Sequence, residues 1–201
     1  MPVHIMAVLG TARQVYGVYT TLKSFVEDEM ATFLRDMGER QFDAAAQHLE
    51  NGTRTPAMMS DYTLLAIGDL ENAYRTFEAS APGGFRLRIR SALSPYAMEE
   101  RATAYEKACA TVLLQSVCYK YRKDENNAKL YIDKAGQFFE MYAEARVTVL
   151  FNREKSRALE YFSEKYGPLV QKGKMPSDDE IRAPINRAIN AERKQLEALS
   201  G

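Results

Sequence analysis

The feature that most constrains the fold of this chain is a recurring pair of residues, an alanine followed four positions later by a bulky apolar residue. It occurs at Ala45–Leu49, Ala73–Phe77, Ala128–Ile132 and Ala158–Phe162. In a helix, residues four apart lie on the same face, and a small residue there lets a neighbouring helix approach closely. The pattern therefore predicts helices packed against helices, with the four alanines buried.

Proline, glycine and turn residues divide the chain into segments with helical periodicity. The strongest break is Ala81-Pro82-Gly83-Gly84. We therefore predict an all-α fold, either a multi-helix bundle or an irregular α-solenoid of about six to seven helices. The predicted helices span about residues 2–36, 39–49, 57–79, 95–122, 128–166 and 177–199, with 128–166 forming either one helix or two joined near Asn152.

The last predicted helix has a clear start signal and an internal proline. Ser177 and Glu180 have the spacing of a capping box, in which the two residues satisfy each other's backbone N–H groups. Pro184 should bend this helix or end a first short piece, because proline lacks a backbone donor. The predicted domains are a helical bundle or solenoid at 1–171, divisible near 81–95, and a linker with a C-terminal helix at 172–201.

One stretch resembles the second helix of a tetratricopeptide repeat, through Gly68, Leu70, Ala73 and Phe77. The four alanines are 28, 55 and 30 residues apart, whereas that family repeats at about 34 residues. The resemblance implies a concave surface that binds a peptide or a partner helix, and no catalysis. Partial matches to the same pattern occur at Gly38, Ala45 and Leu49, at Tyr119, Ala128, Ile132 and Ala135, and at Ala158 and Phe162.

The charges of the chain are balanced, with 27 Lys and Arg residues against 27 Asp and Glu residues. A nucleic-acid-binding protein usually carries a basic excess, so nucleic acid is not an expected partner. The start of the chain lacks the basic and small residues of a secretory signal. We therefore expect a cytoplasmic protein in which Cys109 and Cys118 are reduced and buried.

Residue patterns that carry catalysis or bind metals are missing from the sequence. His4 and His48 are the only histidines, and neither has a second ligand at the spacing of a helical metal site. No Gly-x-Ser-x-Gly elbow or phosphate-binding glycine loop is present. We predict no catalytic residue, no metal and no cofactor.

Three arginines after the central break form a candidate contact for an anion or an acidic partner. Arg86, Arg88 and Arg90 alternate with apolar residues, which is the period of an extended segment. In a short arm at 84–92 they would project on one side and could hold phosphate or carboxylate groups. The alternative is an arm whose apolar side packs on the helices and whose arginines face water.

The N-terminal helix carries a second candidate contact. Gly10, Gly17 and Ser24 are spaced by seven residues, so they share a face suited to helix packing or oligomerisation. The segment is too short and too interrupted for a transmembrane helix. It is interpreted as a core helix, an oligomer contact or a helix inserted at a membrane interface.

The function predicted from these observations is a non-catalytic protein–protein interaction module or adaptor. It would bind a protein partner through a groove between helices. One alternative is a membrane-acting or self-assembling effector that uses the N-terminal helix; the other is a helical-bundle protein that binds a small ligand. A homo-oligomer is compatible with each of these, and membrane binding is not favoured.

Overall fold

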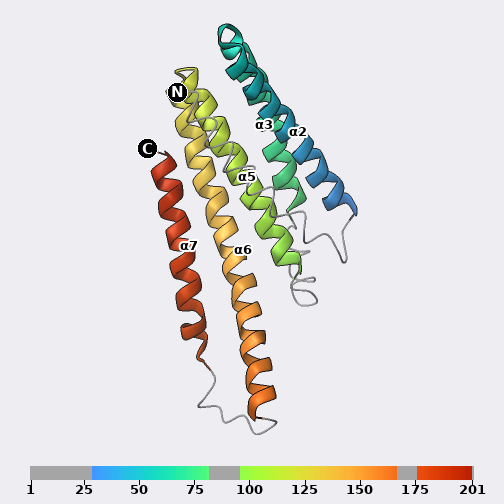
Figure 1. The fold of residues 1–201 in the computed structure, drawn as a ribbon, viewed down its shortest axis with the longest axis vertical. Helices are drawn as coiled ribbons and strands as arrows, with labels where there is room; N and C mark the ends of the chain where they lie inside the picture. Colours follow the sequence, from blue (N-terminus) through green and yellow to red (C-terminus); the bar gives the residue numbers. More distant parts are fainter. Residues whose placement is uncertain (1–28, 82–95, 167–175, 201) are drawn as a thin grey trace.

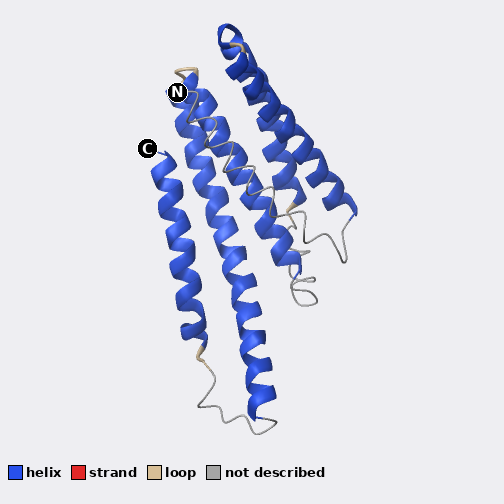
Figure 2. Cartoon of the chain, in the orientation of Figure 1, coloured by secondary structure: helices blue, strands red, loops and turns tan. Residues whose placement is uncertain are grey.

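The computed structural model describes residues 29–81, 96–166 and 176–200, and these residues are almost entirely helical (Figure 2). Five α-helices and one 3-10 helix lie within them, with no strand, so the predicted all-α fold is confirmed for this part of the chain. The described residues contain fewer α-helices than the six to seven predicted. The elements are α2 (Glu29–Arg54), η2 (Pro56–Met58), α3 (Met59–Ser80), α5 (Tyr96–Tyr121), α6 (Glu125–Tyr166) and α7 (Asp178–Ser200).

Successive helices lie side by side in a row, from α2 through α3, α5 and α6 to α7 (Figure 1). Each helix of the pairs α2–α5 and α3–α6 also contacts its partner across the helix between them, so the row has two layers. Ion pairs Arg35–Glu100 and Glu39–Lys107 join α2 to α5, and Lys134 on α6 donates a hydrogen bond to Tyr74 on α3. Helices α2 and α5 therefore share one layer, and α3 and α6 share the other.

The core confirms three of the four predicted alanine positions. Ala45 and Ala73 are fully buried and Ala128 is 1% exposed, because each faces a neighbouring helix. The large side chains buried with them are Phe42, Leu49, Leu70, Phe77 and Leu114. A small residue beside a large one is thus what brings these helices close together.

The prediction that Ala158 is buried is wrong, since its side chain is partly exposed. Helix α6, with 42 residues, is much longer than its neighbours. Lys155 pairs with Asp178, the first residue of α7, so Ala158 lies beyond the end of the helix that covers α6. Among the described residues, no helix faces this short side chain.

The predicted break between residues 36 and 39 is also wrong, because α2 is continuous through Gly38. A Cβ atom at Gly38 would lie 2.6 Å from Cε1 of Phe77 on α3. The predicted end of the next helix near residue 49, before Asn51-Gly52, fails for a similar reason. Gly52 is buried, and a Cβ there would lie 2.5 Å from Sδ of Met59, while the helix continues to Arg54. Both glycines allow close packing and end no helix.

The turn between α5 and α6 is where the sequence placed it. Lys123 has a φ of 61°, and the N–H of Asp124 donates to the carbonyl of Tyr119, as in a Schellman motif. The Asp124 carboxylate then caps α6 by accepting from the N–H of Asn127. Helix α6 continues unbroken past Asn152, which decides between one helix and two.

The C-terminal helix confirms one prediction and excludes one of the two alternatives given for Pro184. The capping box is present, with the Glu180 N–H donating to Oγ of Ser177 at 3.2 Å and the Ser177 N–H donating to the Glu180 carboxylate at 2.7 Å. Pro184, however, lies inside a continuous helix and ends no short piece. It is exposed and near the start of α7, where it removes only the hydrogen bond to the carbonyl four residues earlier.

The buried position of Ala73 leads to a first prediction. Replacing Ala73 with leucine should lower the free energy of unfolding by about 1–3 kcal/mol, because extra atoms must overpack the contact between α2 and α3. Urea denaturation followed by circular dichroism measures this change. The same substitution at Ala79, which is exposed on α3, is the control and should be nearly neutral. Equal effects at both positions would contradict the buried packing of Ala73.

Candidate functional site

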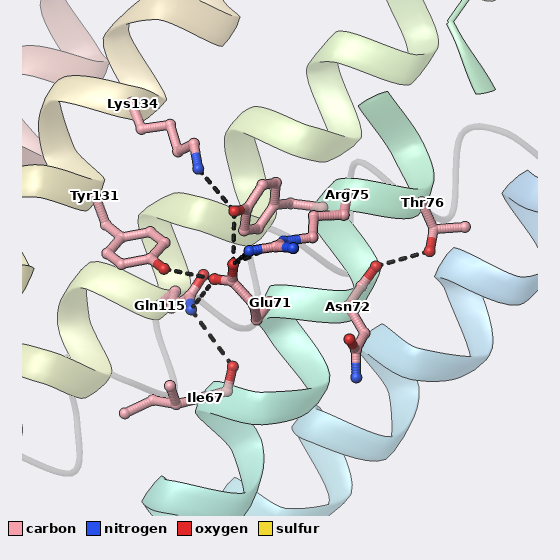
Figure 3. A network of polar contacts seen from close by, with 9 residues as sticks. Ile67, Glu71, Asn72, Arg75, Thr76, Gln115, Tyr131 and Lys134 are labelled. Atoms are coloured by element: carbon pink, nitrogen blue, oxygen red, sulfur yellow. Dashed lines mark hydrogen bonds and ion pairs between the residues drawn. The ribbon is translucent and has the colours of Figure 1, made fainter. Parts of the chain in front are cut away.

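The most connected polar group in the described chain is the carboxylate of Glu71 in α3 (Figure 3). Its Oε1 accepts hydrogen bonds from the Tyr74 hydroxyl and from Nε of Arg75, each at 2.8 Å. Its Oε2 accepts from Nε2 of Gln115 on α5 at 3.1 Å and from the Tyr131 hydroxyl on α6. One side chain thus links three helices.

Helical spacing and burial explain how these groups meet. Tyr74 and Arg75 follow Glu71 by three and four residues, so they lie on its side of α3. Gln115 is fully buried, and its Nε2 also donates to the carbonyl of Ile67 at 3.4 Å. Both acceptors of Nε2 lie on α3, which orients the amide nitrogen toward Glu71.

A lysine and several aromatic rings extend the cluster along α6. Nζ of Lys134 donates to the Tyr74 hydroxyl at 2.7 Å and lies 4.1 Å from the centroid of the same ring. Tyr119 stacks on Tyr131 with 5.2 Å between ring centroids. We call Glu71, Tyr74, Tyr131 and Lys134 the α3–α6 seam. Hydrogen bonds, a cation–π contact and ring contacts there all join the same two helices.

The electrostatics of the seam keep Glu71 charged. Burial alone would raise its pKa, but the hydrogen bonds from Tyr131, Tyr74, Gln115 and Arg75 outweigh burial and lower the pKa to about 2. The pKa of Tyr131 is raised, first by burial and then by the neighbouring carboxylate. Near neutral pH the pair is therefore a carboxylate and a neutral phenol, the combination that gives a strong hydrogen bond.

The pKa values of Glu71 and of the two cysteines limit the chemistry that these side chains can perform. A general acid or base works best when its pKa is close to the working pH. The pKa of Glu71 is far below neutrality, and burial raises the pKa of both Cys109 and Cys118 to about 12. Proton transfer by Glu71 and nucleophilic attack by either thiolate are thus disfavoured at neutral pH. The arrangement is suited to holding helices together and presenting side chains.

Two exposed leucines flank the seam. Leu64 lies seven residues before Glu71, and Leu130 lies four residues before Lys134, so each shares the side of its helix with a seam residue. Leu64 is 56% exposed and Leu130 is 59% exposed. Apolar side chains therefore stand in solvent on both sides of a fixed polar cluster.

None of the site residues predicted from the sequence belongs to this cluster. Arg86, Arg88 and Arg90 lie outside the described residues, and so do the predicted packing face of the N-terminal helix and its residues Gly10, Gly17 and Ser24. Tyr119 and Tyr131 could be expected at helix contacts from their positions in the sequence. Glu71 could not, because its partners Gln115 and Tyr131 are 44 and 60 residues away.

The described residues contain neither a candidate metal site nor a candidate membrane-spanning helix. No three His, Cys, Asp or Glu side chains there gather closely enough to hold a metal ion. No helix among the same residues is long and apolar enough to cross a membrane. Comparison with family models, curated proteins and solved structures finds no match to this chain.

Proposed function

We propose that the chain is a non-catalytic α-helical interaction module that binds a protein partner along the α3–α6 seam. The observation that carries the proposal is the pair of exposed leucines, Leu64 and Leu130, beside a fixed cluster of tyrosine, lysine and glutamate side chains. Exposed apolar side chains beside a few ordered polar groups are typical of protein interfaces.

The rigidity of the cluster supports this role. Tyr131 is only 9% exposed and is held by Glu71 and by stacking on Tyr119, so it keeps α3 and α6 in a fixed arrangement under the surface that a partner would contact. Lys134 is held in the same way against Tyr74. Side chains that are already ordered before binding contribute more to affinity than mobile ones. The pKa of Glu71, far from neutrality, supports a binding role over a catalytic one.

Site-specific photo-crosslinking tests the proposal. A photoreactive phenylalanine analogue replaces Leu130 in the full-length chain, and crosslinked proteins from native cells are identified by mass spectrometry. The matched control carries the analogue at Glu144, which is also exposed on α6 and lies four turns from Leu130. We expect one dominant crosslinked protein from position 130 and none of that protein from position 144.

A point substitution then measures affinity for the protein that was identified. Leu130→Glu should weaken binding by roughly tenfold or more, because it places a charge in an apolar contact. The helical circular dichroism signal should stay unchanged, since Leu130 is exposed. Equal crosslinking from positions 130 and 144, or binding unaffected by Leu130→Glu, would sink the proposal.

A further inference from the structure

Gly68 is an exposed glycine in the interior of α3 that no packing among the described residues explains. A Cβ atom at this position would meet no described atom within 4 Å. Glycine inside a helix lowers its stability by about 1 kcal/mol relative to alanine. At Gly38 the close approach of Phe77 accounts for that cost, and at Gly68 nothing in the described chain does.

The surface around Gly68 combines apolar and charged residues at helical spacing. Leu64 and Leu65, one turn before Gly68, are 56% and 53% exposed. Asp61 lies seven residues before the glycine and Arg75 seven residues after it, and both are exposed. Seven residues make about two turns, so Asp61, Gly68 and Arg75 form one line along the outer face of α3.

We propose that two copies of this chain associate through the outer faces of α3, which cross antiparallel about a two-fold axis at Gly68. A two-fold axis there places Asp61 of each copy opposite Arg75 of the other. Because the glycine has no side chain, the two helices approach closely at the crossing. Leu64 and Leu65 of each copy then pack beside the bare backbone at Gly68 of the second copy.

The distribution of charge identifies a second copy as the occupant of this face. An isologous contact must be complementary to itself, so each attractive pair needs both of its members on the same surface, placed symmetrically about the axis. Asp61 and Arg75 meet that requirement, being equally distant from Gly68 along the helix. The Arg75 side chain is 68% exposed, and its guanidinium has more donors than Glu71 occupies.

This association shares Leu64 with the proposed partner site, but the two proposals are tested on different helices. The dimer face is centred on Gly68 of α3, whereas the proposed function is tested at Leu130 of α6. Leu130→Glu should leave the self-association of the chain unchanged. Loss of partner binding and loss of dimerisation are therefore separate results.

Analytical ultracentrifugation of the full-length chain over a concentration series tests the dimer. We expect a reversible monomer–dimer equilibrium. Gly68→Leu should raise the dissociation constant by roughly a hundredfold, because it blocks the close crossing. Leucine is a good helix former, so circular dichroism should show an intact fold. The matched control is Gly136→Leu on α6, where a Cβ atom also meets nothing within 4 Å and where dimerisation should be unaffected.

A charge exchange makes the test specific for the Asp61–Arg75 contact. The D61R chain alone and the R75D chain alone should each have a dimer dissociation constant raised by roughly tenfold or more, because like charges then face each other. An equimolar mixture of the two variants pairs opposite charges at both ends and should recover a heterodimer. A wild-type chain that is monomeric throughout the series, insensitivity to Gly68→Leu, or a mixture that stays monomeric would each overturn the proposal.

Discussion

Replacing Phe77 with alanine is expected to lower the free energy of unfolding by about 3–5 kcal/mol, as measured by urea denaturation. The Phe77 side chain is fully buried, and its ring packs against the backbone of α2 at Gly38. Nζ of Lys107 lies 5.6 Å from the ring centroid. The substitution therefore leaves a cavity at the contact of α2, α3 and α5 and removes the ring beside a buried ammonium group.

Phe33→Ala is the matched control for this prediction. Phe33 lies on α2 and is 62% exposed, so its truncation should change the free energy of unfolding by no more than about 0.5 kcal/mol. If the two alanine variants are equally stable, Phe77 does not occupy the core described here.

Gly38 provides a second, more specific measurement of the same contact. In the wild-type chain, Gly38→Ala places a Cβ atom 2.6 Å from the Phe77 ring and should be destabilising. In the Phe77→Ala background that clash is gone, and the same change should be neutral or stabilising by up to about 1 kcal/mol. The two substitutions should thus be clearly non-additive. Additive effects would mean that Gly38 and Phe77 do not touch.

The helices that could be predicted from the sequence are those marked by local signals. The capping box at Ser177, the turn near Lys123 and the periodicity of residues 57–79 depend on neighbours in the chain, and the structure contains all three. The failures at Gly38 and Gly52 have one cause. A glycine inside a helix and a glycine after a helix look alike in sequence, and only Phe77 or Met59, packing from another element, distinguishes them.

The candidate site was harder to predict because it is assembled from distant segments. The pair Glu71 and Arg75 has ordinary helical spacing, so the sequence shows at most a local ion pair. What makes Glu71 unusual is the buried Gln115 and the Tyr131 hydroxyl, contributed by two other helices. Their approach follows from the two-layer arrangement, which places α6 beside α3 and cannot be deduced from spacing along the chain.

Glu71→Gln is expected to lower the free energy of unfolding at pH 7 by about 2–4 kcal/mol. The carboxylate accepts four hydrogen bonds, and an amide in its place sets a donor against the donors of Gln115, Tyr131 or Arg75. A buried polar group that loses its partner destabilises the fold by about 1–3 kcal/mol. Glu144→Gln, which removes an exposed carboxylate on α6, is the control and should be nearly neutral.

The pH dependence identifies the charge of Glu71 as the source of this stability. The folded chain holds its pKa at about 2, below the ordinary value of 4.5, so the folded state favours the ionised form. The stabilisation is therefore complete above about pH 4.5 and is lost as the pH falls toward 2, where the folded chain also takes up the proton. The difference between wild type and Glu71→Gln should be constant from pH 7 down to about pH 4.5 and should shrink from there toward pH 2. A difference that is the same at both ends of this range would show that shape, and not charge, makes Glu71 stabilising.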